Sequence, residues 1–461
     1  MILQIADYKN LIYTIAIIFS LFVGFVLFRA LFIKNKQIKK INIEENNNTA
    51  GYKERLFRLI EVDTPSFSEG EEYYKFKEIV EEQFPLIHKY LQKEKVDGNS
   101  IYSYKSTIKD SPSILFASHI DYIGNHIEAY KTNTYIYGNG TFDSKSLLFV
   151  IFEAVESILR DKGKLDLNLT LVITNDDEAK NDGLSKIINL FLKRGAFFNL
   201  VIEEGSGIID AEVYGLKSTY ALVGLGVSGQ IQLRFESEAE DDLYKFISEV
   251  SKPKFFKMKV DQNSSKVLKS ISKDMQLKDR FFLNNIFFFR RKAKRIIEDR
   301  YHEFEKMLKT SVKFSEIKNK DMKYYIDAIF ELSTHEKAAD ILIHLDDLMT
   351  KYKLDYKILN VINSSKVTKT YTYGYNLAKN AIIDVFKDLY IAPVIVTKIS
   401  EKRYFDKVSD CVIRFSPLYY DFEDFKLANT SKSRINCASL ESGINFYKYI
   451  LNNYSNKRWF F

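Results

Sequence analysis

The sequence predicts an α/β protein built on a doubly wound, mostly parallel sheet with helices on both faces. Short apolar runs alternate with segments of helical periodicity along the first half of the chain, as in strand–helix–strand units. A smaller α+β pattern interrupts this alternation, and a long uncharged segment lies near the N-terminus. These observations divide the chain into a membrane-spanning helix, a main α/β domain in two parts, and a lid inserted between the parts.

The N-terminal segment is long and apolar enough to cross a bilayer. Leu11 to Phe28 contains no charged residue, and about 20 apolar residues span the hydrocarbon core. We predict a single transmembrane anchor within residues 1–33, followed by a polar linker over residues 34–50. A cleaved signal peptide is less favoured, because no net positive region precedes the apolar run. Basic residues follow it, so the positive-inside rule favours a cytoplasmic location for the rest of the chain, and an outside domain is the competing topology.

The main domain is predicted over residues 51–226 and 368–461. Its first part alternates between amphipathic helices and short buried strands: helix 71–83, strand 113–118, helix 147–160, strand 167–174, helix 184–192 and strand 199–202. Its second part repeats the pattern with helix 375–389, strand 392–398 and helix 439–454. The alternation predicts one sheet shared by both parts of the chain.

The lid is predicted over residues 227–367. Its elements are strand 230–236, helix 241–250, strand 322–333, helix 335–352 and strand 354–362. Among them lies a long basic and aromatic stretch over residues 277–308, "LKDRFFLNNIFFFRRKAKRIIEDRYHEFEKML". One interpretation is an element that rests on a membrane surface. The favoured interpretation is a helix of the lid whose long basic side chains cover apolar surface.

Composition and cysteine usage exclude several classes of protein. The 46% hydrophobic and 28% charged content is that of a globular chain, which excludes wholesale disorder. The net charge of +7 is spread along the sequence and does not predict a nucleic-acid partner. Cys411 and Cys437 are the only cysteines, so neither a disulfide framework nor a cysteine-based zinc site is expected.

Reactive side chains follow the predicted core strands. The stretch "SILFASHIDYIGN" delivers His119 and Asp121 at the end of an apolar run. The next strand runs into the acids 176–178, and the third ends in Glu203 and Glu204. Asp143 follows a glycine-containing turn and opens a helix. Each feature has an ordinary explanation by itself: a surface histidine, a solvated acidic loop, or a helix cap at Asp143.

The set of features taken together favours a metal site. The carboxyl ends of parallel strands meet at one edge of a sheet, where ligands bind. Carboxylates crowded at that edge repel one another, and a divalent cation is the usual compensation. Imidazole combined with carboxylates, without thiolates, suits Zn²⁺ or Mn²⁺. The sequence therefore predicts a divalent-metal centre.

The ordered motifs resemble those of the carboxypeptidase S and aminoacylase-type metallopeptidases, a family that uses two zinc ions. The resemblance runs through "SHID", "YGNGTFDSK", "NDDEA" and "IEEG", and it resumes in "EKRYF", "VIRFSPL" and "SLESGINFYKYI". It extends from residue 52 onward and is weak in the lid. It implies a zinc-peptidase type of fold with a dimerisation-type lid, and hydrolysis of amide bonds in peptides or N-acyl amino acids. A homodimer is compatible with it.

Matched residue by residue, the resemblance implies a set of metal ligands. His119 and Glu203 match ligands of the first metal, Asp143 matches the bridging ligand, and Glu178 matches a ligand of the second metal. Asp121 matches the carboxylate that orients the imidazole of His119. The implied cofactor is Zn²⁺, as one ion or two.

The remaining matches concern proton transfer and substrate binding. Asp177 falls where the family has a glutamate general base, and it is one methylene shorter than glutamate. The implied reaction is attack of an activated water on an amide carbonyl, with this base moving the proton to the leaving amine. Arg403 matches a position that holds the terminal carboxylate of the substrate, which a guanidinium binds through two parallel hydrogen bonds.

The C-terminal region departs from the family pattern. The last metal ligand of the family is a histidine, whereas this chain has Asn429 in "LANTSKSRI". None of its six histidines lies beyond residue 344, so no shift of register supplies that ligand. The missing histidine is a ligand of the second metal in the family, so the departure affects that metal site. Two hypotheses follow: a membrane-anchored metallohydrolase, or a catalytically inactive relative that acts as a membrane-tethered binding or scaffolding protein.

Overall fold

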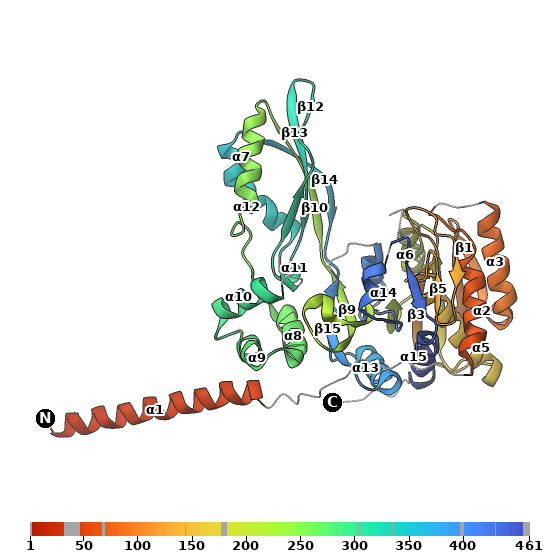
Figure 1. The fold of residues 1–461 in the computed structure, drawn as a ribbon, viewed down its shortest axis with the longest axis horizontal. Helices are drawn as coiled ribbons and strands as arrows, with labels where there is room; N and C mark the ends of the chain where they lie inside the picture. Colours follow the sequence, from red (N-terminus) through yellow and green to blue (C-terminus); the bar gives the residue numbers. More distant parts are fainter. Residues whose placement is uncertain are drawn as a thin grey trace.

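The computed structural model describes residues 2–31, 47–66, 70–142, 144–176, 182–301, 304–333, 335–396, 401–428 and 430–454. Two separate sheets and a projecting N-terminal helix dominate the arrangement (Figure 1). The predicted fold class is confirmed: a sheet with parallel strands at its centre carries helices on both faces, and a smaller sheet forms a second layer system.

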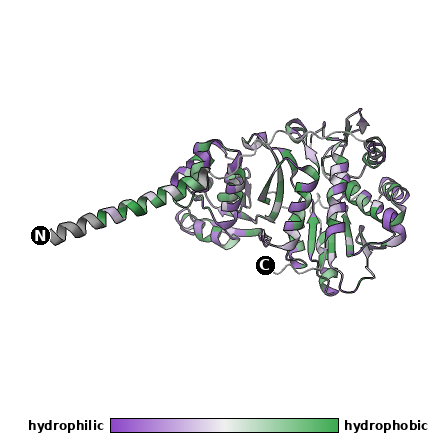
Figure 2. Cartoon of the chain, turned by 90° about the horizontal axis from the view of Figure 1, so that it is seen from below, coloured by the Kyte–Doolittle hydropathy of each residue, from purple (hydrophilic) through white to green (hydrophobic). Residues whose placement is uncertain are grey.

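The N-terminal helix α1 (Ile2–Leu31) extends away from the folded body (Figure 2). Within the described residues, it is the one helix whose length and apolar content suffice to cross a membrane. The window Leu11–Phe28 has a mean hydropathy of 2.6 and is only 6% buried. A signal sequence or the core helix of a soluble protein meets the same criterion of length and composition. Most of the predicted linker over residues 34–50 lies outside the described residues.

The main sheet has the strand order β1-β2-β6-β3-β7-β16-β9-β8-β17, and β15 pairs with β9. Pairs β6–β3, β3–β7 and β7–β16 at its centre are parallel, whereas the flanking pairs β1–β2, β2–β6, β16–β9 and β8–β9 are antiparallel. The strands are β1 (Gln92–Val96), β2 (Asn99–Tyr104), β3 (Ser113–His119), β6 (Asn168–Thr174), β7 (Leu200–Glu203), β8 (Gly207–Asp210), β9 (Thr219–Val227), β15 (Tyr390–Val396), β16 (Val412–Arg414) and β17 (Tyr419–Tyr420).

Helices cover both faces of this sheet because its central strands are apolar on both sides. Strand β3 shows the reason: Phe116 packs into the larger core cluster with α5 and α15, while Leu115 packs on the opposite face with α6. The helices of the main body are α2 (Thr49–Ile60), α3 (Glu71–Gln83), α4 (Pro85–Tyr90), α5 (Lys145–Lys162), α6 (Gly183–Lys193), α13 (Tyr373–Phe386), α14 (Phe422–Leu427) and α15 (Ser439–Asn453).

Short elements complete the main body. A three-stranded sheet joins β18 (Arg434–Asn436), β5 (Tyr135–Tyr137) and β4 (Tyr130–Lys131), and thereby ties the C-terminal region to the turn before α5. The 3₁₀ helices are η1 (Ala211–Tyr214), η2 (Ser272–Asp274) and η4 (Glu401–Lys407).

The second sheet has a core of its own. Its order is β11-β13-β10-β14, with β12 paired to β13, and all these pairs are antiparallel. Helices α7 (Glu240–Val250) and α12 (Ala338–Lys351) pack on one face of it. The strands are β10 (Gln230–Ser237), β11 (Ser311–Phe314), β12 (Lys318–Lys320), β13 (Lys323–Glu331) and β14 (Asp355–Ile362). The boundaries predicted at 226/227 and 367/368 remain predictions.

The basic and aromatic stretch is not a helix of the lid, and that expectation is wrong. It divides into α9 (Leu277–Asn284), α10 (Arg290–Arg300) and α11 (Glu305–Leu308), which follow α8 (Gln262–Ile271). Its apolar side chains, including Leu283, Ile286 and Ile297, belong to the core cluster of the main sheet and not to that of the lid sheet. The stretch therefore forms a helical layer at the side of the main body that faces α1 (Figure 1).

Candidate active site

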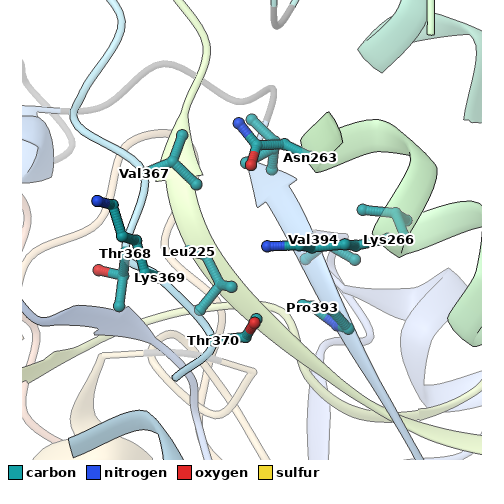
Figure 3. A pocket seen from close by; sticks show the side chains of 11 residues that line it. Leu225, Asn263, Lys266, Val367, Thr368, Lys369, Thr370, Pro393 and Val394 are labelled. Atoms are coloured by element: carbon teal, nitrogen blue, oxygen red, sulfur yellow. The ribbon is translucent and has the colours of Figure 1, made fainter. Parts of the chain in front are cut away.

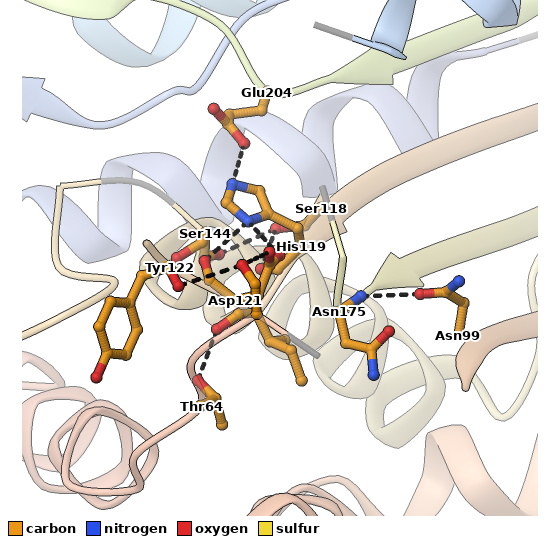
Figure 4. A network of polar contacts seen from close by, with 11 residues as sticks. Thr64, Asn99, Ser118, His119, Asp121, Tyr122, Ser144, Asn175 and Glu204 are labelled. Atoms are coloured by element: carbon orange, nitrogen blue, oxygen red, sulfur yellow. Dashed lines mark hydrogen bonds and ion pairs between the residues drawn. The ribbon is translucent and has the colours of Figure 1, made fainter. Parts of the chain in front are cut away.

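His119 is the last residue of β3 and lies in a buried polar network (Figure 4). Its imidazole is 3% exposed. Nδ1 lies 3.0 Å from Oδ1 of Asp121, and Nε2 lies 2.7 Å from Oε2 of Glu204. The side chain thus joins two carboxylates that arrive from different strands of the sheet.

These contacts determine what the imidazole can bind. Because Nδ1 faces a carboxylate, the neutral ring carries its proton there and presents a lone pair at Nε2. The oxygens of an ionised Glu204 are acceptors too. Two acceptors 2.7 Å apart need a proton or a cation between them. The donor set, one imidazole with buried carboxylates, therefore fits a divalent metal of intermediate softness.

Asp121 is positioned by residues that precede the sheet. Ser66 donates a hydrogen bond from Oγ to Oδ2 of Asp121 over 2.6 Å, while the other carboxylate oxygen faces His119. Thr64 donates to the carbonyl of Ile120 over 2.7 Å (Figure 4). The carboxylate is only 1% exposed. It is thus held on both sides, as expected for a group that fixes the orientation of a ligand histidine.

Glu203 lies beside the same site but contacts a cation of the chain itself. Nε of Arg414 lies 2.8 Å from Oε1 of Glu203, and both side chains are buried. Glu203 and His119 also line one small hollow together with Phe405 from η4. The segment that contains Arg403 therefore runs beside the histidine.

The start of α5 is tied to the end of β3. Ser118 donates from Oγ to the carbonyl of Ser144 over 3.0 Å, next to His119 in the chain (Figure 4). Ser144 has φ +48° and ψ −94°, a sparsely populated backbone conformation that costs about 1–3 kcal/mol. Such strain is concentrated at functional sites, and this residue directly follows Asp143 in the sequence.

Lys145 is a buried cation at the same helix start. Burial lowers the pKa of its ammonium group from 10.5 to about 7, an effect that nearby carboxylates of Asp63 and Glu72 oppose. The ammonium group donates to the backbone carbonyl of Val62. It therefore connects the first turn of α5 to the segment that carries Thr64 and Ser66.

Both ends of the acidic segment after β6 are held in place. The backbone N–H of Asn175 donates to Oδ1 of Asn99 over 2.8 Å, and the N–H of Gly183 donates to Oδ2 of Asp176 over 3.1 Å. A Cβ atom on Gly183 would lie 2.3 Å from that carboxylate oxygen. A larger residue at the first position of α6 would therefore displace the side chains of Asp176 and Asn99.

An open cleft lies in front of the network. His119 and Asp121 line it, together with the loop 122–130. Within that loop, burial and the adjacent carboxylate of Asp63 raise the pKa of Tyr122. Thr430, Ser431 and Ser433 line it as well, so this C-terminal segment borders the same cleft as the histidine.

A second hollow lies between β9, β15 and α8 (Figure 3). Its lining includes Leu225, Lys266 and Pro393, and none of its lining residues belongs to the cleft at His119. Nothing in its lining repeats the imidazole–carboxylate chemistry of the main site.

The structure brings together only part of the predicted site. His119, Asp121 and Glu203 are described and lie close to one another. The other predicted residues lie outside the description: Asp143, Asp177, Glu178 and Asn429 entirely, and Arg403 with its side chain. Among the described residues, no group of three or more His, Cys, Asp or Glu side chains has the geometry to hold a metal ion.

Three residues of the network were not assigned from the sequence. Glu204 reaches the imidazole, Ser66 holds Asp121, and Arg414 neutralises Glu203. The tandem acids in "IEEG" are a signal for the first, because neighbouring residues of a strand point to opposite faces. The other two come from distant parts of the chain and have no local signal.

Solved structures with the same fold are peptidases. An M20 family metallo-carboxypeptidase from Sulfolobus solfataricus superimposes with a TM-score of 0.63 at 14% identity and covers 87% of this chain and 98% of its own. Human carnosine dipeptidase 1 superimposes with a TM-score of 0.59 at 12% identity, covering 88% of this chain and 96% of its own. These similarities establish the class: an α/β fold of the metallopeptidase type.

The sequence comparisons define the family. The model of Peptidase family M20/M25/M40 matches residues 115–453, and the chain belongs to this family. A probable carboxypeptidase S-like 2 of Dictyostelium discoideum is 22% identical over 87% of this chain and 84% of its own length. N-fatty-acyl-amino acid synthase/hydrolase PM20D1 of Bos taurus is 24% identical over 87% of each chain. By its family, the protein is a hydrolase of amide bonds, as the sequence motifs predicted.

Proposed function

We propose that this protein is a membrane-anchored, metal-dependent hydrolase that cleaves amide bonds in peptides or N-acyl amino acids. The buried contact of His119 with Asp121 and Glu204 carries the proposal. An imidazole held in one tautomer by one carboxylate, and facing a second carboxylate at 2.7 Å, offers a nitrogen and an oxygen donor to a divalent metal.

The metal would be Zn²⁺, held by the Nε2 lone pair of His119 and by acids of the same sheet edge. When bound, such an ion lowers the pKa of a water and polarises a carbonyl. Both Glu204 and Glu203 lie beside His119, but the guanidinium of Arg414 already compensates the charge of Glu203. We assign Glu204 as the described partner of His119 in binding the metal, and Glu203 as the alternative that the family match favours.

The remaining roles come from the family match. By that match, Asp143 and Glu178 would help to hold the metal, and Asp177 would take a proton from the attacking water and deliver it to the leaving amine. Asp121 fixes the imidazole, supported by Ser66. Arg403 binds a carboxylate of the substrate, an assignment supported by the position of Phe405 beside His119 in the same short helix.

Two groups of relatives support the substrate class. One is described as carboxypeptidase S-like and the other as N-fatty-acyl-amino acid synthase/hydrolase. Both descriptions concern an amide bond next to an amino-acid carboxylate. The cleft in front of His119 is open to solvent, so such a molecule can reach the histidine.

The anchor and the oligomeric state belong to the same proposal. Helix α1 would cross the membrane once, with the hydrolase on the cytoplasmic side. The edge strand β14 of the lid sheet exposes apolar side chains, including Tyr356, Ile358 and Val361. An unprotected apolar edge strand favours pairing with another chain, which supports a homodimer through the lid. Sedimentation of the detergent-solubilised protein measures this directly.

Metal analysis combined with a cleavage assay tests the function. The purified full-length protein is expected to contain zinc and to release amino acids from small N-acyl amino acids. Asp143→Ala should remove both the metal and the cleavage. A metal-free wild-type protein, with cleavage equal to that of Asp143→Ala, would contradict the proposal.

The second candidate function is an inactive relative that binds or scaffolds at the membrane. Asn429 favours it, since an amide replaces the histidine that the family uses for the second metal. Asn429→His separates the two candidates: in an impaired hydrolase it should raise the zinc content and the cleavage rate together. A higher zinc content without any cleavage favours the inactive relative.

A further inference from the structure

The segment between α9 and α10 lies against the C-terminal end of α1. Nδ2 of Asn285 donates a hydrogen bond over 3.1 Å to the backbone carbonyl of Val26, and Val26 is only 3% exposed. The ring of Phe288 packs edge-on against that of Phe22, with centroids 4.9 Å apart. These contacts attach the segment to the second half of the apolar window of α1.

The position along α1 sets the depth of the segment in a bilayer. The first charged residue after the window is Arg29, and Phe22 precedes it by two helical turns, or about 11 Å of helix. If α1 spans the membrane, a side chain that contacts Phe22 lies below the level of the headgroups. Interfacial protein segments bury their apolar face about 5–10 Å deep, which is the same depth.

The segment exposes large apolar side chains at this level. Phe287 is 69% exposed, Phe288 is 44% exposed, and Leu277 at the start of α9 is 56% exposed. Exposed aromatic side chains in a group are unfavourable in water, but aromatic residues are enriched at the membrane–water interface. Phe288 contacts Phe22 of α1, so this group of exposed apolar side chains adjoins the anchor.

Positive charge follows these aromatic residues in the sequence. Arg290, Arg291 and Lys292 form the first turn of α10, and all three are exposed. The guanidinium of Arg290 lies 5.2 Å from the ring centroid of Phe287. Cations in the first turn oppose the helix dipole, so helix stability does not explain them. Basic residues at this level of a bilayer face the phosphates of anionic lipids.

We propose that the segment Ile286–Lys292 is an interfacial membrane-binding element: Phe287 and Phe288 insert into the leaflet that α1 leaves, and the three basic side chains bind anionic phospholipid headgroups. The inference rests on the proposed anchor. With α1 and this segment as two contacts, the main body cannot turn freely on its linker, and the open cleft keeps a fixed orientation to the bilayer.

Depth-dependent fluorescence quenching tests the insertion. The only tryptophan, Trp459, is replaced by phenylalanine in the full-length protein, and a single tryptophan is introduced by Phe287→Trp. Two reference variants carry Phe19→Trp in the middle of α1 or Tyr371→Trp, which is 72% exposed on the main body. Each is reconstituted in vesicles of phosphatidylcholine and phosphatidylserine whose acyl chains are brominated at either a shallow or a deep position.

The three variants separate the possible results. We expect deep bromines to quench the tryptophan at 19, shallow bromines to quench that at 287, and neither to quench that at 371. Quenching at 19 with none at 287 would overturn the inference and leave the anchor intact. Absence of quenching at both positions would overturn the anchor and the inference together.

The role of the charges has its own control. Arg290→Glu, Arg291→Glu and Lys292→Glu combined should abolish shallow quenching at 287 while quenching at 19 persists. The same change of charge at Lys318, Lys320 and Lys323 on the distant β12–β13 hairpin should leave both signals unchanged. Equal quenching at 287 in both triple variants, and in vesicles without phosphatidylserine, would refute binding to anionic lipid.

Discussion

Arg414 and Glu203 lie directly opposite each other on the parallel strands β16 and β7 and form a buried ion pair beneath the candidate site. Their Nε and Oε1 atoms are 2.8 Å apart, with 2% and 1% of the side chains exposed. The backbone repeats the pairing, because the N–H of Phe415 donates to the carbonyl of Glu203 over 2.8 Å. The pair fixes the register of the two strands next to His119.

Removing one partner of this pair should cost far more stability than removing both. Arg414→Met leaves a buried carboxylate without its cation, and we expect a loss of about 3–5 kcal/mol in the free energy of unfolding. The double variant Glu203→Leu/Arg414→Met should recover most of this loss, because buried ion pairs gain little over apolar packing. Urea unfolding of the metal-free protein in detergent, followed by circular dichroism, measures both. If the loss in the double variant equals the sum of the losses in Glu203→Leu and Arg414→Met, the two residues are not coupled.

The same geometry separates the roles of the two adjacent acids. Glu204→Gln removes the charge that faces Nε2 of His119 at 2.7 Å, so we expect a large loss of bound zinc. Glu203→Gln should chiefly reduce stability, since its charge is matched by Arg414. The zinc content of the two variants at equal ionic strength, measured together with their unfolding midpoints, distinguishes the two roles. A loss of zinc confined to Glu203→Gln would reverse the assignment.

The strands of the main sheet could be predicted because each is short, apolar and bounded by polar residues. Strand β3 was expected over residues 113–118 and is Ser113–His119. The delivery of His119 and Asp121 to one edge follows from that strand alone. Residues such as Arg414 could not be assigned to the site. Strands β16 and β7 are neighbours in the sheet, but the whole lid separates them in the sequence. Sequence periodicity identifies strands but not their neighbours.

The prediction that the aromatic and basic stretch is a helix of the lid was wrong for a different reason. Its apolar residues recur at helical spacing, which predicts that a face is buried but not against which domain. Leu283 and Ile297 could fill either core, and the structure has them in that of the main sheet. The acid pair shows the same limit on a smaller scale, since Glu203 and Glu204 are adjacent in the sequence but pair with Arg414 and His119, respectively.

Gly205, which follows the two acids, is required by the close approach of two backbones. A Cβ atom there would lie 2.2 Å from the carbonyl carbon and oxygen of Arg414. Gly205→Ala must push β16 away from β7, and overpacking of this kind costs about 1–3 kcal/mol. Gly51→Ala is the matched control: it lies in α2 with nothing within 4 Å, and we expect a gain of up to about 1 kcal/mol. The urea midpoints of the two variants test this expectation. Equal midpoints for Gly205→Ala and Gly51→Ala would contradict the clash.

The thiol of Cys411 should make stability depend on alkaline pH. Burial raises its pKa from 9.0 to about 11, so above pH 9 the unfolded chain releases this proton while the folded chain retains it. Stability from this group is therefore complete below pH 9 and is lost as the pH rises to 11, by about 2–3 kcal/mol for two pKa units.

Cys411→Ala isolates this contribution from the titration of tyrosines and lysines. The difference in unfolding free energy between wild type and variant should be constant from pH 7 to 9 and then shift in favour of the variant. A difference that stays constant up to pH 11 would mean that the thiol ionises in the folded protein as readily as in the unfolded chain. Reaction of the native protein with a thiol reagent at pH 9 provides an independent measurement, and it should be slow because the buried thiol remains protonated.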